Sequence, residues 1–516
     1  MTVALMADRM ASAGHLAGLL GPWRQARHPS PSYRALADRI RVLVLDGRLP
    51  PGTRLPSERE LALALGTSRT TVTSAYGVLR EISFLTSRRG APSRTAVPPS
   101  AGARSTGVIT PSAENESHLL DLGAAALTAP PGMAEAVAAA SEALPAYLGG
   151  HGYTARGVPA LRDLVARRHT ERGLPTSPDQ ILVTSGALQA FALVLRTFVS
   201  PGDRVLVEHP TYPNALEAIR QTGARTVPVP LARDGWDLVM LEAAMRQSAP
   251  RLAYLIPDFH NPTGLLMDER ERGRTARAVS RARTLTVVDE TLLDLDLDPG
   301  LEPGGAPDGS SGALPSPLGV GTPQEAVLHI GSTSKSFWGG LGIGWLRAPL
   351  PLVARLLSVR AATDLGTSVL SQLTAAELLV KQDSILTERR TVLRSRRAAL
   401  VDALRTHLPQ WRFAVPRGGL SLWCELDAPV SSDLAVLAAQ LGVRLASGPK
   451  FGVDGAFERY VRLPFTLPEA DLRTAVTRIA DAYATLTRDG PHGLSPRSSA
   501  SRRIGPAADD STPVVT

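Results

Sequence analysis

The segment between Ile181 and Ile330 repeats one pattern, in which a short apolar run is followed by a stretch with helical spacing. The strand-like runs lie at 181–185, 204–208, 252–256, 285–289 and 326–330. Strands that alternate with helices favour a sheet covered by helices on both faces, and ligands bind such sheets at the carboxyl ends of the strands. The pattern therefore predicts an α/β domain with a ligand site along that edge.

The chain of 516 residues is too long for one ordinary core, so its length indicates about three domain-sized units. Composition places a Pro/Ser/Ala/Gly-rich linker after a compact N-terminal unit. The expected divisions are an N-terminal extension at 1–30, a mainly helical unit at 31–96, a flexible linker at 97–118, the α/β domain at 119–487 and a disordered tail at 488–516. Inside the α/β domain we expect a low-complexity insertion at 299–322 and a smaller α+β subdomain at 411–487.

Cysteine usage and hydropathy indicate the compartment. The single Cys424 excludes an internal disulfide and fits a reducing cytoplasm. Asp8 and Arg9 interrupt the N-terminal apolar stretch, and no apolar run approaches the roughly 18 residues of a membrane helix. The sequence therefore predicts a cytoplasmic protein with no membrane segment.

Residues 31–96 have the pattern of a helix-turn-helix followed by a β-wing. Ser57 and Glu60 are spaced as a capping box that begins a second helix at Glu58, and this helix ends at Gly66. Ser68 caps a third helix, 69–80, whose early turns would enter the major groove. Phe84–Ser87 and the basic turn after it are typical of a wing.

Positive charge is concentrated in this unit. The net charge is +8, and residues 31–96 hold eleven arginines against five carboxylates. Such a concentration suggests nucleic acid as a partner. On charge alone, a solvated arginine-rich surface is an equally good explanation.

The stretches Asp46–Leu61 and Ser68–Val72 resemble the winged-helix domain of the GntR regulators. One departure lies at Glu81-Ile82-Ser83, where the family usually turns on Glu-Gly. The resemblance implies DNA binding, with contacts expected from Arg54, Ser57, Arg69, Thr70, Thr73, Arg88 and Arg89.

Lys335 is conspicuous because the chain has lysine at only three positions, the others being Lys381 and Lys450. Arginine stays protonated, whereas a desolvated lysine can lose its proton and attack a carbonyl to form a Schiff base. Ser332 and Ser334 frame this lysine, and their hydroxyls would suit a phosphate. The sequence therefore predicts a Schiff-base lysine beside an anion.

Further candidate residues lie where strands give way to loops. Gly186 and Ala187 open a helix whose free amides could hold a phosphate. Tyr212 could cover a ring, Asn261 stands in an Asn-Pro-Thr-Gly turn, and Asp289 ends an apolar strand where its burial calls for a positive partner. Taken singly, plainer explanations compete: core packing for Tyr212, a turn residue for Asn261 and a helix cap for Asp289.

In this order the residues resemble the pyridoxal-phosphate site of the fold-type I aminotransferases. The resemblance implies that Lys335 is the catalytic lysine, that Asp289 pairs with the pyridine nitrogen and that Arg462 grips a substrate or effector carboxylate. It further implies that the ring is contacted by Tyr212 and Asn261, and the phosphate by Gly186, Ala187, Ser332 and Ser334.

The two halves together resemble the MocR subgroup of GntR regulators. This resemblance implies a homodimeric transcriptional regulator that binds its own promoter or a neighbouring operator. Its effector would be pyridoxal 5'-phosphate, another B6 vitamer, or an amine or amino acid that forms an adduct with the cofactor.

Two departures from the family pattern bear on cofactor binding. Gly342 stands where the family has a phosphate-binding arginine, and Thr291 and Leu292 stand where it has a tyrosine that bonds the cofactor. Arg347 is a candidate to supply the missing charge. These departures argue against efficient turnover, but two alternatives stay open: an active aminotransferase, and a domain that binds no cofactor and serves only for dimerisation.

Overall fold

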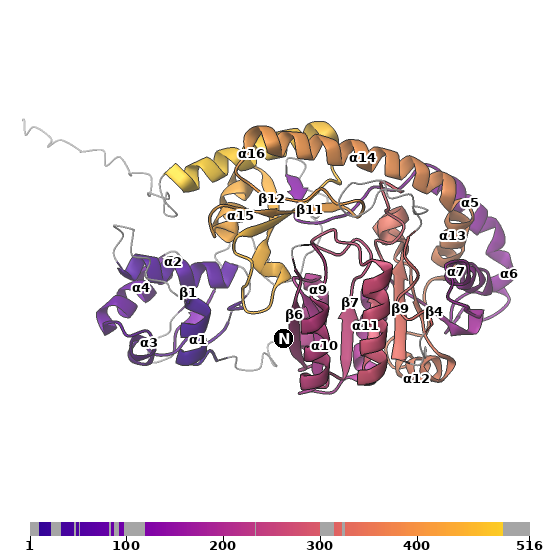
Figure 1. The fold of residues 1–516 in the computed structure, drawn as a ribbon, viewed down its shortest axis with the longest axis horizontal. Coiled ribbons are helices and arrows are strands. Elements are labelled where there is room, and N and C mark those ends of the chain that lie inside the picture. The colour runs from indigo at the N-terminus through magenta and orange to yellow at the C-terminus, as the bar shows by residue number, and fades with distance from the viewer. Residues whose placement is uncertain are drawn as a thin grey trace, which may run out of the picture.

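The computed structural model describes residues 10–21, 32–45, 48–50, 52–81, 84–86, 92–96, 119–232, 234–299, 314–321 and 326–488. Figure 1 shows an N-terminal domain, a large α/β domain and a smaller subdomain under two long helices. The expected linker, the expected tail from 489 onward and most of the expected insertion lie outside the described residues.

The N-terminal domain is a winged helix with an additional helix in front. Its elements are α1 Ala13–Leu20, α2 Ser32–Leu45, α3 Glu58–Ala64, α4 Arg69–Glu81, and the antiparallel strands β1 Leu85–Thr86 and β2 Arg94–Thr95. Leu16 and Leu20 of α1 are buried in the same core as the inner faces of α2, α3 and α4. The predicted capping box is present, since Ser57 and Glu60 bond each other's backbone amides. The predicted helix-turn-helix is therefore confirmed.

The large domain contains a seven-stranded sheet in the order β4-β10-β9-β8-β7-β5-β6. The predicted runs form β4 Ile181–Thr184, β5 Arg204–His209, β7 Leu252–Leu255, β8 Leu285–Asp289 and β9 Val327–Ser332. Two strands were not predicted, the edge strand β6 Arg225–Pro230 and the antiparallel strand β10 Gly344–Arg347. β6 carries two prolines, and only Val229 of its six residues is buried, so it lacks the apolar run that marks the inner strands.

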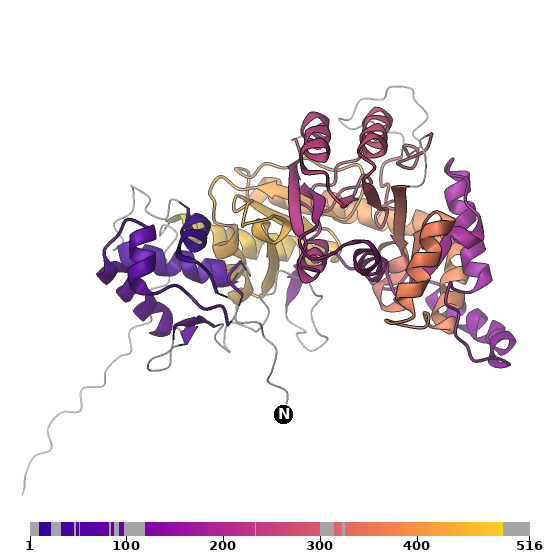
Figure 2. The same cartoon turned by 90° about the horizontal axis from the view of Figure 1, so that it is seen from below.

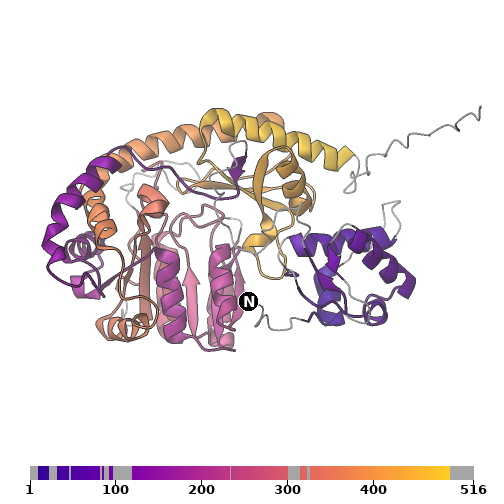
Figure 3. The ribbon, with the colours of Figure 1, turned by 180° about the vertical axis from the view of Figure 1, so that it is seen from behind.

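Helices cover both faces of this sheet, as predicted for the fold class. One face packs against α8 Ala187–Phe198, α9 Pro213–Gln221 and α12 Leu350–Arg360. The other packs against α5 Met133–Ala143, α7 Pro159–Glu171, α10 Leu238–Ser248, α11 Glu269–Ala282 and α13 Val369–Val380. A short helix, α6 Pro145–Leu148, follows α5 at the end of the molecule far from the winged helix (Figures 1 and 3).

The small subdomain is a four-stranded sheet in the order β11-β13-β12-β3. Its strands are β11 Ser421–Glu425, β13 Tyr460–Pro464, β12 Val443–Ser447 and β3 Leu120–Leu122, and its helices are α15 Ser431–Gln440, α16 Glu469–Arg488 and the 26-residue α14 Gln382–His407. β3 comes from the beginning of the α/β region, directly after the expected linker. The first residues after the linker are therefore built into the small subdomain.

The winged helix lies beside the small subdomain in both perpendicular views (Figures 1 and 2). α2 packs next to α15, and Arg41 Nη2 lies 3.6 Å from Asp433 Oδ1 across this contact. Among the described helices, none has both the length and the apolar character that a membrane crossing needs.

Candidate functional site

The site lies at the carboxyl ends of β8 and β9, the edge that the strand pattern predicted. Asp289 is the last residue of β8 and pairs with Ile330 of β9, and Ser332 ends β9. Lys335 follows on a single π-helical turn, Ser334–Trp338, an irregularity that is frequent at functional sites. The sheet register thus brings Asp289 and the lysine turn to the same edge.

Lys335 points into the protein rather than into solvent. Its Nζ donates a 2.6 Å hydrogen bond to the carbonyl oxygen of Ala125, directly downstream of β3. Burial, reinforced by Arg462 and opposed by Asp289, lowers the lysine pKa to about 8. A substantial fraction of the amine is therefore neutral, and nucleophilic, at mildly alkaline pH.

Asp289 is buried, and its carboxylate is held by neutral donors. Oδ2 accepts a 2.5 Å bond from the Tyr254 hydroxyl, and Oδ1 accepts bonds from the amide and hydroxyl of Thr291. Burial raises the pKa of Asp289, and these hydrogen bonds oppose that rise. We expected a positive partner for Asp289. Among the described residues no cation is bonded to its carboxylate, although Lys335 is close enough to interact with it electrostatically.

Arg462 is buried on β13, in the sheet of the small subdomain. Its Nη1 lies 3.4 Å from Asn261 Oδ1, its Nη2 donates to the carbonyl of Gly123, and its Nε has no hydrogen-bond partner among the described residues. Burial lowers the pKa of Arg462 to about 10. The unbonded Nε leaves one guanidinium donor for a ligand.

Tyr212 precedes α9 and packs against the main core of the sheet. Burial and then the charge of Asp289 raise the pKa of its phenol to about 12, while Arg462 lowers it. The structure therefore brings five of the predicted residues close together, namely Tyr212, Asp289, Asn261, Lys335 and Arg462.

The candidate phosphate cradle consists of backbone and hydroxyl groups. Gly186 precedes α8 and has a φ of 105°. The backbone of Gly344 lies so close to it that a Cβ on Gly344 would be 2.5 Å from the carbonyl carbon of Gly186. Ala187 is the first residue of α8, whose leading amides have no partner within the helix. The Ser332 hydroxyl lies 2.9 Å from the Ser334 hydroxyl and 3.1 Å from the carbonyl of Ile343. These groups can hold an anion by hydrogen bonds.

Arg347 does not supply the charge that Gly342 omits. On β10, Arg347 pairs with His329 of β9. Gly344, three residues earlier on β10, pairs with Ser332 beside the cradle. The Arg347 side chain is directed toward Thr176, with Nε 3.4 Å from the threonine hydroxyl. The suggested compensation was therefore wrong, because the arginine lies too far down the strand. Gly342 itself has a φ of +64° with open space beside it.

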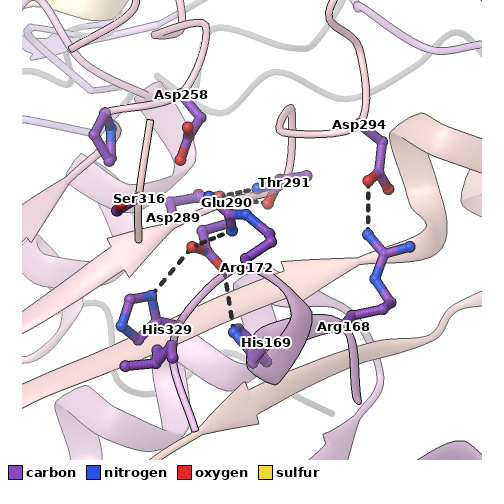
Figure 4. Close-up of polar contacts among 12 residues, drawn as sticks. Arg168, His169, Arg172, Asp258, Asp289, Glu290, Thr291, Asp294, Ser316 and His329 are labelled. Atoms are coloured by element: carbon purple, nitrogen blue, oxygen red, sulfur yellow. Dashed lines mark hydrogen bonds and ion pairs between the residues drawn. The ribbon is translucent and has the colours of Figure 1, made fainter. Parts of the chain in front are cut away.

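A buried ionic cluster around Glu290, the residue directly after Asp289, was not predicted (Figure 4). Glu290 Oε1 accepts bonds from Arg172 Nη1 at 2.9 Å and His329 Nδ1 at 3.2 Å, and His169 lies nearby. Burial opposes ionisation of Glu290, but Arg172, His329 and His169 outweigh it and hold its pKa well below its usual range. The sequence offered one clue to Glu290, its place directly after Asp289. Its partners come from two distant elements, the end of α7 and β9.

Two further contacts hold the lysine turn against α7. Ser336 donates a 2.7 Å bond to Asp294, which also accepts a 2.6 Å bond from Arg168 of α7. Asp294 thereby ties the residue after Lys335 to the large domain. We regard Asp294 and Ser336 as positioning residues.

The expected DNA contacts fall into three groups. Arg69, Thr70 and Thr73 are exposed on the first turns of α4. Ser57 uses its hydroxyl to cap α3, and Arg54 makes backbone bridges to Met10 and Arg94 beside the wing. Arg88 and Arg89 lie outside the described residues.

Comparison with known proteins identifies both halves. Residues 118–479 match the family "Aminotransferase class I and II", and residues 32–94 match "Bacterial regulatory proteins, gntR family". The chain is 28% identical to the uncharacterized HTH-type transcriptional regulator YisV of Bacillus subtilis (strain 168), over 90% of this chain and 99% of that protein. It is also 28% identical to the probable rhizopine catabolism regulatory protein MocR of Rhizobium meliloti, over 74% of this chain and 78% of that one.

Among solved structures, the chain resembles LysN, the α-aminoadipate aminotransferase of Thermus thermophilus, complexed with N-(5'-phosphopyridoxyl)-L-leucine. The TM-score is 0.63 at 30% identity, covering 72% of this chain and 94% of LysN. The predicted fold class is confirmed by this likeness and by the two family matches. The chain therefore belongs to the aminotransferase class I and II family and, with its gntR-family domain, to the MocR subfamily of GntR transcriptional regulators.

Proposed function

We propose that this regulator binds DNA through residues 31–96 and senses pyridoxal 5'-phosphate, or an adduct of it with an amine, through residues 119–487. One observation carries the sensing half: the Lys335 amine is turned inward onto the Ala125 carbonyl, at 2.6 Å, and shares its site with the buried Asp289. Burial of the amine lowers its pKa to about 8. A lysine held in this way is suited to reversible bonding with an aldehyde. We place this activity in the cytoplasm.

The donor set fits pyridoxal phosphate. Besides the bond from Tyr254, Oδ2 of Asp289 can accept another hydrogen bond, which would come from the protonated pyridine nitrogen. Tyr212 would cover the ring, Asn261 would bond its phenolic oxygen, and the cradle of Gly186, Ala187, Ser332 and Ser334 would hold the phosphate. When bound, this cofactor supplies an aldehyde carbon and an electron-withdrawing ring.

The chain's own groups would divide the remaining tasks. Lys335 provides the amine, and Asp289 keeps a proton at the ring nitrogen while ionised. Arg462 would bind a carboxylate through its unbonded Nε, which favours amino acids over simple amines as effectors. In the cradle, hydrogen bonds would hold the phosphate without a guanidinium from position 342.

We further propose a homodimer with two winged helices, which would read two half-sites on its own promoter or a neighbouring operator. Exposed apolar side chains on and after α5 and α6 support this proposal, namely Val137, Leu148 and Tyr153. Their burial in a second copy would remove this apolar surface from water. Sedimentation of the full chain tests it, since a monomer at micromolar concentration would contradict it.

DNA binding is tested by retardation of a fragment from the gene's own upstream region. We expect specific binding whose affinity falls by about tenfold or more as salt rises from 50 to 200 mM. The reason is that each arginine–phosphate contact releases a counterion, which added salt opposes. Equal, salt-insensitive binding to any DNA would contradict the proposal.

Cofactor binding is tested separately. Borohydride reduction of the protein mixed with pyridoxal phosphate, followed by peptide mass mapping, should place a phosphopyridoxyl group on Lys335. The Lys335→Ala variant serves as the control. An unlabelled wild-type lysine would favour the alternative in which this domain serves only for dimerisation.

An active aminotransferase is the second candidate, since Lys335, Asp289 and Arg462 share one site. It predicts amino-group exchange between an amino acid and a keto acid that Lys335→Ala abolishes. Gly342 in place of the family's arginine, and Thr291 and Leu292 in place of its tyrosine, argue against efficient turnover.

A further inference from the structure

The loop 448–458 connects the ligand site to the winged helix. It follows β12 in the small subdomain and begins with a short 3-10 turn, Gly448–Phe451. One end contacts residues of the proposed ligand site, and the other contacts the DNA-binding domain.

The site end of the loop is Phe451. The Arg462 guanidinium lies over the Phe451 ring, with Cζ 5.0 Å from the ring centre. The carbonyl of Phe451 accepts a 2.8 Å bond from the amide of Thr211, the residue before Tyr212. Phe451 thus touches the carboxylate-binding arginine and the segment that carries the ring-covering tyrosine.

The loop is folded back on itself. A Cβ on Gly448 would lie 1.9 Å from the carbonyl oxygen of Phe457, so the two ends of the loop are in direct contact. His209, just before the Thr211 segment, accepts a 3.0 Å bond from the amide of Val453 and packs edge-on against Phe457 at 4.6 Å. These contacts join Gly448, Val453 and Phe457 into one packed unit.

The far end of the loop touches the winged helix directly at Gly455 and reaches it indirectly through α15. Gly455, with a φ of +74°, lies so close to Arg48 that a Cβ there would be 1.9 Å from Nη1. Glu458 binds the amide and hydroxyl of Ser432 at the start of α15, at 2.9 and 3.0 Å. The next residue, Asp433, faces Arg41 of α2 at 3.6 Å.

We propose that the loop 448–458 transmits ligand binding at Arg462 to the position of the DNA-binding domain, an inference that rests on the sensing function proposed above. A ligand carboxylate on Arg462 neutralises the cation above Phe451 and weakens its attraction to the ring. Because the loop is closed on itself, a shift at Phe451 alters the Gly455–Arg48 contact and the arrangement of the winged helix. Ligand and DNA affinities are then linked by one coupling free energy.

The test changes the far end of the loop and leaves the ligand residues intact. Gly455→Ala places a methyl where the Arg48 side chain lies, and Arg48→Ala removes the same contact without straining the loop. Gly173→Ala is the matched control, because Gly173 also has a positive φ, +87°, but nothing within 4 Å of its Cβ. DNA affinity is measured by fluorescence anisotropy on the full chain, with and without saturating pyridoxal phosphate plus an amino acid.

In the wild type and in Gly173→Ala we expect the ligand to change DNA affinity by at least about fivefold. In Gly455→Ala and Arg48→Ala we expect this ratio to fall below about twofold, with borohydride labelling of Lys335 unchanged. A wild type whose DNA affinity ignores the ligand overturns the sensing function itself. A responsive wild type whose two loop-contact variants respond equally overturns only the route through the loop.

Discussion

The hydroxyl of Tyr254 donates a 2.5 Å hydrogen bond to Oδ2 of Asp289, and both groups are buried. The bond favours the ionised carboxylate and opposes the rise in its pKa that burial causes. Its removal therefore raises the pKa of Asp289 further, so the carboxylate becomes protonated at a higher pH.

Tyr254→Phe should weaken pyridoxal phosphate binding about tenfold, since a hydrogen bond to a charged group contributes roughly 1.5–3 kcal/mol. The loss should be larger at pH 6 than at pH 8, because Asp289 protonates first in the variant. Absorbance titrations at both pH values measure it. Tyr483→Phe, which breaks a phenol–carboxylate bond to Asp427 far from the site, should leave the affinity unchanged.

Lys335→Met should stabilise the ligand-free protein at pH 7. Folding lowers the lysine pKa from 10.5 to about 8, so the unfolded chain binds more protons between these values and wild-type stability rises with pH across that window. Below pH 8 the charged Lys335 amine lowers the free energy of unfolding by roughly 2–3 kcal/mol relative to methionine. This figure already allows for the hydrogen bond to Ala125 that the variant loses. Urea unfolding should show this advantage of the variant at pH 7 and little of it at pH 10.5. The exposed Lys381→Met should show no such trend.

Gly342→Arg should tighten pyridoxal phosphate binding by about tenfold or more, by adding a charge-assisted phosphate contact. The position has open space around it, but its φ of +64° strains any side chain and should lower folding stability by about 1 kcal/mol. Ligand titration and thermal melting separate the two effects. An affinity gain of the same size in Gly173→Arg would show that general charge, not position, is responsible.

Arg69→Ala should weaken DNA binding and reduce the salt dependence by about one phosphate contact. Arg69 is exposed at the start of α4, whereas Arg80 in the last turn of the same helix bonds the carbonyl of Tyr76. Arg80→Ala is therefore the matched control. Anisotropy titrations between 50 and 200 mM salt give both slopes, and equal effects of the two variants would argue against α4 as the reading helix.

Local patterns carried much of the prediction. The inner strands are apolar runs because both of their faces are covered, and the start of α3 is fixed by Ser57 and Glu60 within one turn. The edge strand β6 was missed because it contains Pro228 and Pro230 and is largely open to solvent, which removes the strand signal. The correct predictions and the missed strand both follow from local sequence, that is, from residues close together along the chain.

The site was harder to predict where it depends on long-range contacts. Tyr254 reads as one more apolar strand residue, although its hydroxyl reaches Asp289, 35 positions away. Glu290 draws Arg172 from 118 positions before it. The distance of Arg347 from the cradle became clear only from the register of β10.

Two carbonyl oxygens of one short segment occupy both cations of the site, Ala125 on Lys335 and Gly123 on Arg462. An aldehyde that reacts with Lys335 must displace the Ala125 carbonyl, whereas a carboxylate can reach the unbonded Nε of Arg462 without displacing Gly123. The measured affinity is therefore what remains after the lysine's internal bond is given up. These carbonyls directly follow β3, the first described element after the winged helix's linker. Ligand entry is thus a competition with the chain's own backbone, at the point where the regulator's two halves are joined.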